Sequence, residues 1–188
     1  SRVRRFDVGD CVWAYEFTHS KGGFYAEFVA VNADHVGHIP RRLDLQQAGA
    51  AAVTALTAFQ GTDDVLHLRR GQTVLIFGAT GAVGTMAVQF ARRRGARVIA
   101  TASGSKATRL IRRLGAAAVF DGRARNAVDR LRELAPEGLD AVLAFAGGKT
   151  LDGCLDLVKP GGHVAHPNGV EPEPKRGGRG IGVEGYDS

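Results

Sequence analysis

The sequence predicts an α/β fold: a doubly wound parallel sheet, preceded by a smaller β-rich segment. Three observations support this prediction. Apolar strand-like runs alternate with helical patterns after residue 72, a glycine turn follows the first of these runs, and the first 40 residues contain aromatic and β-branched runs instead. Strands that alternate with helices are typical of parallel sheets with right-handed crossovers.

The first strand, turn and helix after residue 72 form a candidate phosphate-binding segment. Residues 74–77 are apolar and predict a buried strand, and a helix is expected over 82–93 from its apolar spacing. Between them, Gly81 allows the backbone to approach a pyrophosphate, and Gly84 allows the helix to pack closely on the strand. The free N–H groups of a helix start receive phosphates. The predicted cofactor-binding residues here are Ala79, Thr80, Gly81, Ala82, Val83 and Gly84.

Further strands and helices alternate downstream of this segment. We expect strands at 97–101, 118–120, 139–145 and 162–165, and helices at 105–114, 125–134 and 149–158. Gly95 and Gly115 stand just past two helix ends, where cap glycines occur. A complete dinucleotide-binding sheet has six strands, and no sixth strand is evident. Residues 71–170 are therefore predicted to form an incomplete Rossmann sheet.

The flanking segments have a different composition. Strands are expected at 11–15 and 24–31 with a turn at Gly22-Gly23, inside a β-rich piece that covers residues 1–44. A helix is expected over 45–60, capped by Asp44 or a neighbour, in a linker that covers residues 45–70. Residues 171–188 are poor in apolar residues and are predicted to be a flexible tail.

Charge, apolar runs and cysteine content indicate which partners and which cellular location to expect. The formal charge of +6 suits an anionic cofactor or a nucleic acid. No apolar run approaches the roughly 20 residues that span a bilayer, and the first residues lack the apolar segment of a secretory signal. Two cysteines, Cys11 and Cys154, build no disulfide framework, so both are expected to be small buried hydrophobic side chains and the protein is expected to be cytoplasmic. Because no apolar run is long enough to span a bilayer, no membrane partner is expected.

Several short segments carry a family resemblance. They are residues 6–13, 22–29, 56–59, 71–76, 78–84, 114–116 and 159–162. In their order and spacing the chain resembles the medium-chain dehydrogenase/reductase superfamily, in its zinc-independent quinone oxidoreductase (zeta-crystallin-like) branch. The resemblance covers roughly residues 6–170, and the chain resembles an internal fragment of such an enzyme. It implies that residues 1–44 are the last part of a GroES-like catalytic domain.

The same resemblance implies an activity. Members of the branch transfer hydride from NADPH to a quinone or an α,β-unsaturated carbonyl, and the full-length protein is expected to be a homodimer. Two alternatives stay open. One is an enoyl-reductase module of a polyketide-synthase-like protein. The other is a non-catalytic nucleotide- or RNA-binding member, for which the single Arg176-Gly177-Gly178-Arg179 run gives weak support, so nucleic acid is not an expected partner.

Cofactor selection depends on the loop after the second predicted strand. A carboxylate there bonds the ribose 2′-hydroxyl and selects NAD. Residues 101–106 hold no acid that would repel a 2′-phosphate. Ser103 offers a hydrogen bond, and Lys106 and Arg109 offer positive charge, which predicts NADPH over NADH. The alternative is that Lys106 and Arg109 are solvated surface charges.

The nicotinamide half of the cofactor involves other residues. Thr57 aligns with a family position beside the nicotinamide, although it is equally well explained as an ordinary helix threonine. Phe145 and Gly147 end the fourth predicted strand, at the sheet edge where cofactors bind, and glycine there allows close approach to a ribose. Asn168 follows the fifth predicted strand and is expected near the nicotinamide. No catalytic residue is assigned, which suits chemistry carried by a cofactor.

No metal is expected. Zinc-dependent relatives use Cys and His ligands. The resemblance places one ligand position near Val53, where neither Cys nor Asp stands, and no cysteine cluster follows Val12. His163 and His166 are three apart on a strand and are expected on opposite faces.

Overall fold

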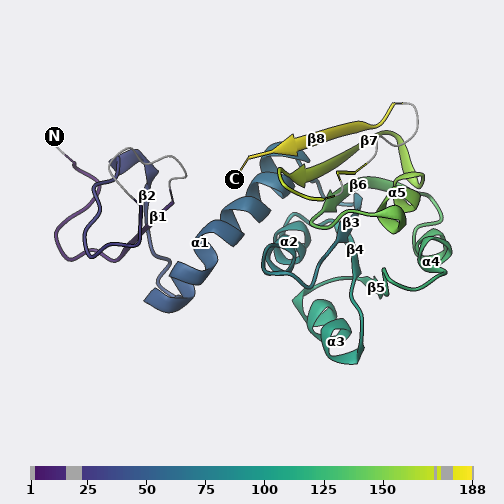
Figure 1. The fold of residues 1–188 in the computed structure, drawn as a ribbon, viewed down its shortest axis with the longest axis horizontal. Helices are drawn as coiled ribbons and strands as arrows, with labels where there is room; N and C mark the ends of the chain where they lie inside the picture. The colour runs from purple at the N-terminus through teal and green to yellow at the C-terminus, as the bar shows by residue number, and fades with distance from the viewer. Residues whose placement is uncertain (1–2, 16–22, 172, 175–179, 188) are drawn as a thin grey trace. The chain divides into compact units, whose positions relative to one another are not determined.

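The computed structural model describes residues 3–15, 23–171, 173–174 and 180–187. The chain divides into two compact units, residues 1–53 and 54–188 (Figure 1). No helix among the described residues is long and apolar enough to cross a bilayer.

The second unit is built on a six-stranded sheet in which every neighbouring pair is parallel. Its strands are β3 (Thr73–Phe77), β4 (Arg97–Thr101), β5 (Ala118–Phe120), β6 (Leu139–Ala144), β7 (Val158–Pro167) and β8 (Gly182–Tyr186). They lie in the order β5-β4-β3-β6-β7-β8. The strand order reverses between β3 and β6, as in a doubly wound dinucleotide-binding sheet.

Helices cover both faces of this sheet because successive strand residues point to opposite sides. The helices are α2 (Ala82–Arg93), α3 (Ser105–Leu114), α4 (Ala127–Leu134) and α5 (Lys149–Leu155). Val74 and Ile76 pack in one core with Ala87 of α2. Leu75 belongs to a second core with Leu131 of α4. The predicted alternation is confirmed, with β7 longer than expected and α4 and α5 shorter.

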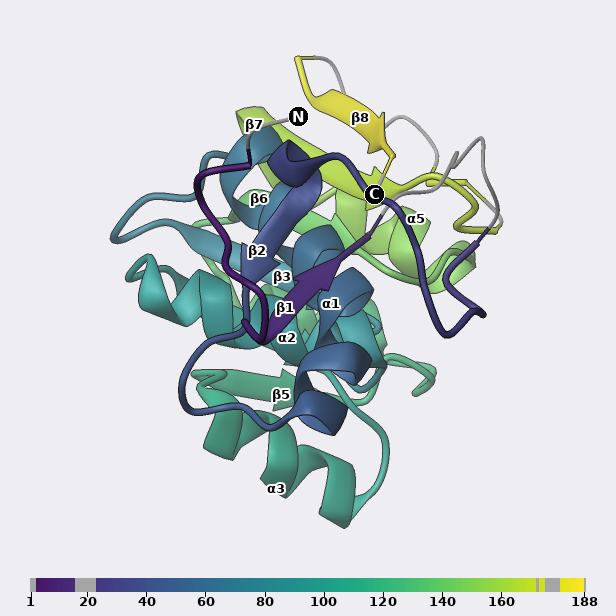
Figure 2. The ribbon, with the colours of Figure 1, turned by 90° about the vertical axis from the view of Figure 1, so that its left-hand side faces the viewer.

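The sixth strand corrects the expectation of an incomplete sheet and of a flexible tail over its whole length. β8 lies beside β7 at the edge of the sheet (Figure 2). In the register of this pair, His163 lies opposite Gly182 and Pro167 opposite Tyr186. It was missed because two of its five residues are glycines, which carry little strand signal. Both glycines make room for side chains of the β7 segment, since a Cβ on Gly182 would lie 3.0 Å from His163 Nδ1. A Cβ on Gly185 would lie 2.6 Å from Asn168 Oδ1 and 3.2 Å from His166 Cε1.

The first unit contains a two-stranded antiparallel sheet of β1 (Val12–Ala14) and β2 (Val36–His38). The predicted strand at 24–31 is wrong, because the structure has no strand in this segment and exposes Tyr25 and Phe28 almost completely. Strand propensity expresses the fit of a side chain to a half-buried pleated surface, and that surface is missing here. Gly22 of the predicted turn lies outside the described residues.

The predicted helix at 45–60 is confirmed as α1 (Leu45–Phe59), which continues into a π-helical turn, η2 (Gln60–Val65). A reciprocal cap starts it: Asp44 Oδ1 accepts from the Gln47 amide at 2.7 Å, and Gln47 Oε1 accepts from the Asp44 amide at 3.2 Å. Of the two cysteines, Cys154 is buried as expected, and burial raises its pKa to about 12. Cys11 is exposed, which corrects the prediction for that residue.

Candidate functional site

The glycine turn between β3 and α2 forms a tight cradle. Gly78 has a φ of +84°, a conformation that favours glycine. A Cβ on Gly84 would overlap the carbonyl oxygen of Gly78 and would lie 2.7 Å from Ala79 Cα. Only glycine therefore lets the first turn of α2 pack this closely on the loop.

The start of α2 faces outward from this cradle. Gly81 caps the helix with an extended backbone, and Thr80, Gly81 and Ala82 are exposed. Ala79 is fully buried and Val83 packs against the core, so both anchor the turn from inside. The first N–H groups of a helix have no intrahelical partner, so this exposed end is suited to a phosphate group.

A pocket of about 290 Å³ extends from the turn across the carboxyl ends of β3 and β4. It is lined by Phe77, Gly78, Thr80, Thr101, Ala102, Ser103, Ala107, Gly122, Arg123 and Ala146. Its volume is near the lower end of the roughly 300–1,000 Å³ usual for small-molecule sites. The lining suits the adenosine half of a dinucleotide, because small and apolar groups surround the cavity and polar groups lie at its rim. The predicted residues Thr80 and Ser103 are thus brought to one cavity.

Thr101 fixes the shape of this pocket and was not predicted. Its Oγ1 accepts a hydrogen bond from the Gly78 amide at 2.8 Å, which joins the glycine turn to the end of β4. A Cβ on Gly122 would lie 3.0 Å from Thr101 Cγ2, so the next loop also approaches closely. Its position in the sequence could have indicated this role, because Thr101 ends one predicted strand and Gly122 follows the next.

An acidic side chain, Asp121, contacts the loop after β4. Its Oδ1 accepts from Ser103 Oγ at 2.5 Å and from the Arg123 amide at 2.9 Å. The Ser103 bond, and then the Arg123 amide, hold the pKa of this carboxyl below its ordinary value. Residues 101–106 themselves hold no acid, but an acid distant in sequence reaches Ser103 from the end of the neighbouring strand β5. Lys106 and Arg109 are exposed on α3, outside the lining of this pocket.

The residues expected near the nicotinamide occupy different positions. Phe145 lies by the glycine turn: a Cβ on Gly78 would be 3.2 Å from its Cβ, and its amide donates to the Phe77 carbonyl at 2.9 Å. Gly147 is half-buried in the loop before α5. Thr57 is buried, and its carbonyl accepts from Tyr186 Oη at 2.9 Å.

Asn168 is exposed at the end of β7. Its Nδ2 donates to Asp187 Oδ1 at 2.6 Å, and its amide donates to the Tyr186 carbonyl at 2.8 Å. Thr57 and Asn168 are thus both tied to β8 and its end, and neither lines the pocket at the glycine turn. Their cofactor roles stay predictions.

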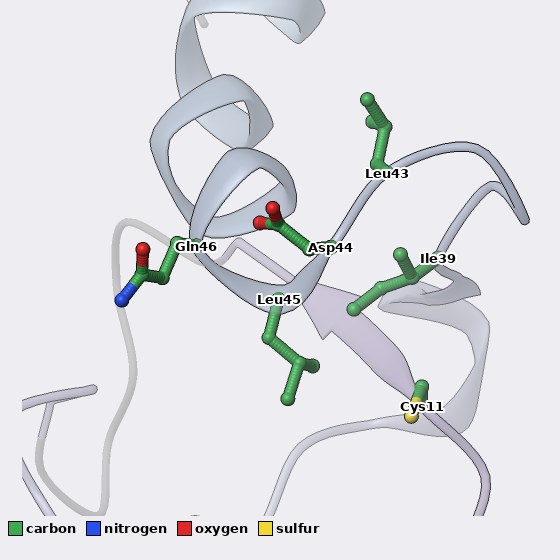
Figure 3. A pocket seen from close by; sticks show the side chains of 6 residues that line it. All are labelled: Cys11, Ile39, Leu43, Asp44, Leu45 and Gln46. Carbon is green, nitrogen blue, oxygen red and sulfur yellow. The ribbon is translucent and has the colours of Figure 1, made fainter.

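The first unit holds a separate pocket of about 580 Å³. It is lined by Cys11, Ile39, Leu43, Asp44, Leu45 and Gln46, and the side chain of Ile39 extends toward the start of α1 (Figure 3). Asp44 is engaged in capping α1, and the described residues that line the cavity include no cation or histidine. In the part of the chain that the structure describes, no three His, Cys, Asp or Glu side chains gather as a metal site. The expected absence of metal stays a prediction.

Comparison with known proteins agrees with this geometry. The family described as zinc-binding dehydrogenase matches residues 82–168. The quinone oxidoreductase of Pongo abelii is 35% identical over 162 residues, which are 85% of this chain and 48% of that protein. The chain therefore spans about half the length of the curated relatives it matches.

Solved structures show the same fold. An alcohol dehydrogenase superfamily protein from Novosphingobium aromaticivorans superposes with a TM-score of 0.84 at 34% identity, over 97% of this chain and 56% of that chain. The mycobacterial protein Rv1454c, solved as a complex with NADPH, superposes with a TM-score of 0.71 at 27% identity, over 82% of this chain and 50% of that chain. With its glycine turn, its six-strand order and these likenesses, the chain belongs to the medium-chain dehydrogenase/reductase superfamily, in its quinone oxidoreductase branch.

Proposed function

We propose that this chain is the cofactor-binding part of an NADPH-dependent, zinc-independent oxidoreductase that reduces a quinone or an α,β-unsaturated carbonyl. The pocket that joins the glycine turn to the loops after β4 and β5 is the observation that carries the proposal. Two likenesses support it: the quinone oxidoreductase of Pongo abelii is 35% identical to this chain, and the solved neighbour Rv1454c is a complex with NADPH.

Different residues of the chain would bind different parts of the cofactor. The exposed residues Thr80, Gly81 and Ala82 would border the pyrophosphate, and the amides of the first turn of α2 would hold it, because the positive end of the helix opens there. The Gly81 amide itself donates to the Gly78 carbonyl at 3.2 Å. The pocket beside Ser103 would take the adenosine, and Lys106 and Arg109 supply positive charge for a 2′-phosphate. Phe145 and Gly147 would border the second ribose.

The chemistry comes from the cofactor: a bound reduced nicotinamide supplies the hydride. The chain's own part is to hold and orient the ring, for which Thr57 and Asn168 are the candidate residues on the β8 side. The substrate pocket and the proton donor belong to the whole protein. A homodimer of the full-length protein and a cytoplasmic location are part of the same proposal.

The full-length protein tests it directly. NADPH oxidation is followed at 340 nm against a panel of quinones and a panel of enones, with NADH in parallel. Oxidation of NADPH by a member of either panel is expected. Reduction restricted to enoyl thioesters would favour an enoyl-reductase module instead. Absence of turnover together with absence of NADPH binding in calorimetry would overturn the proposal.

A further inference from the structure

We propose that Asp121 is a specificity-determining residue that limits the preference of this site for NADPH over NADH. The inference rests on the proposed function, since it concerns how the same pocket distinguishes two cofactors. It concerns an acid that lies 18 residues from its serine partner in sequence and reaches it only through the sheet.

The pairing of two strands fixes the position of this carboxylate. Thr101 of β4 lies opposite Phe120 of β5, and the Ala102 amide donates to the Phe120 carbonyl at 2.9 Å. Ser103 follows Ala102 and Asp121 follows Phe120 in these two paired segments, which is why their side chains meet at 2.5 Å. Asp121 is held by two donors yet is exposed, so a ligand in the adjoining pocket can reach it.

This contact changes what Ser103 offers to a ligand. A serine hydroxyl has one proton to donate, and here Asp121 receives it. While that bond persists, Ser103 has no proton for a 2′-phosphate. The pair therefore presents acceptors, which suit the hydroxyl groups of an unphosphorylated ribose and oppose a phosphate.

Positive charge nearby works in the opposite direction. Arg123 lines the same pocket, and Lys106 and Arg109 are exposed on the adjacent helix α3. Among the described residues no hydrogen bond or ion pair occupies Asp121 Oδ2, so this oxygen is open to a ribose hydroxyl. The cations favour the phosphorylated cofactor, and Asp121 reduces that advantage without cancelling it.

The variant Asp121→Asn isolates the charge. Its amide oxygen can still accept from Ser103 and from the Arg123 amide, so the loop keeps its shape. Removing one like charge beside a phosphate near the surface is expected to tighten NADPH binding by about tenfold, whereas NADH binding stays within about twofold or weakens. The matched control is Asp129→Asn on α4, which removes the same charge from an exposed side chain paired with Arg132.

Isothermal titration of the full-length protein with each cofactor, at one fixed salt concentration, gives the ratio of the two dissociation constants. A rise in NADPH preference in Asp121→Asn, with none in Asp129→Asn, is the expected result. An unchanged ratio in Asp121→Asn, or an equal change for both cofactors, would overturn the inference while leaving the proposed function standing. Failure of the wild-type protein to bind either cofactor overturns the proposed function, and the inference with it.

Discussion

Tyr186 Oη donates a hydrogen bond to the Thr57 carbonyl at 2.9 Å, so the sixth strand is tied to the end of helix α1. Both residues are buried, and burial raises the pKa of the Tyr186 hydroxyl above its ordinary value. Gly61 makes this contact possible, because a Cβ there would lie 2.5 Å from Tyr186 Oη. A segment with a weak strand pattern is thus held by one specific side chain.

Replacing Tyr186 with phenylalanine tests that tie. The variant keeps the ring but leaves the buried Thr57 carbonyl without this donor, so we expect the free energy of unfolding to fall by about 1–2 kcal/mol. Urea unfolding followed by circular dichroism measures the change. The control Tyr25→Phe removes a hydroxyl from a fully exposed ring and should leave stability unchanged. Equal effects of the two variants would contradict the role of the bond.

Asp140 should make the fold sensitive to acid. Burial opposes its charge, but hydrogen bonds from Lys159 Nζ at 2.8 Å and the Thr73 amide at 2.7 Å outweigh burial and lower its pKa. A lowered pKa means that this stabilisation is present above about pH 4 and is lost as the pH falls through the folded-state pKa.

The variant Asp140→Asn should therefore lose about 1 kcal/mol at pH 7 and less at pH 3. Unfolding curves at both pH values give the comparison. As a control, Asp156→Asn alters an exposed carboxyl at the end of α5. If the cost of Asp140→Asn were the same at pH 3 as at pH 7, the charged contacts would not be its cause.

The tight contact at Gly84 predicts a combined loss of stability and binding. In Gly84→Ala the new methyl group has no space beside the Gly78 carbonyl and Ala79, so the turn and α2 must separate. We expect a loss of about 1–3 kcal/mol in stability, as for overpacked sites, together with weaker NADPH binding. Gly49→Ala is the matched control, because its Cβ meets nothing within 4 Å and alanine favours a helix interior. A Gly84→Ala protein with wild-type stability would show that the turn can yield.

Arg94 neutralises a buried carboxylate. Its guanidinium pairs with Asp63, whose side chain is only 7% exposed and whose Oδ2 accepts from Thr62 Oγ1 at 2.8 Å. Arg94→Met leaves this charge unpaired, and we expect a loss of about 2 kcal/mol, below the full cost of a buried pair because Arg94 is half exposed. Chemical unfolding compares it with Arg93→Met, the exposed neighbour on α2. If the two variants lost the same stability, the pair would contribute nothing of its own.

The central layers of this fold follow from local pattern, and the departures have physical causes. Apolar runs such as 74–77 identify buried strands because both faces of a parallel sheet are covered. The strand at 182–186 escaped detection because its glycines make room for His163 and His166, a requirement set by β7. The turn at 78–84 was predictable from its glycines. Asp121 was not, because only strand pairing brings it to Ser103.

The cations of α3 give the last prediction. Lys106 and Arg109 are exposed and belong to the first half of α3, which follows the loop that carries Ser103. If they meet a 2′-phosphate, the double variant Lys106→Gln, Arg109→Gln should weaken NADPH binding by about 10- to 100-fold, since charged hydrogen bonds contribute about 1.5–3 kcal/mol each, less at exposed sites. NADH binding should stay within about twofold, because NADH lacks that phosphate.

The control Arg112→Gln, Arg113→Gln removes the same charge from the last turn of the same helix. If both double variants weakened NADPH equally, the field of the whole basic surface would be responsible, and a specific phosphate site on Lys106 and Arg109 would be wrong.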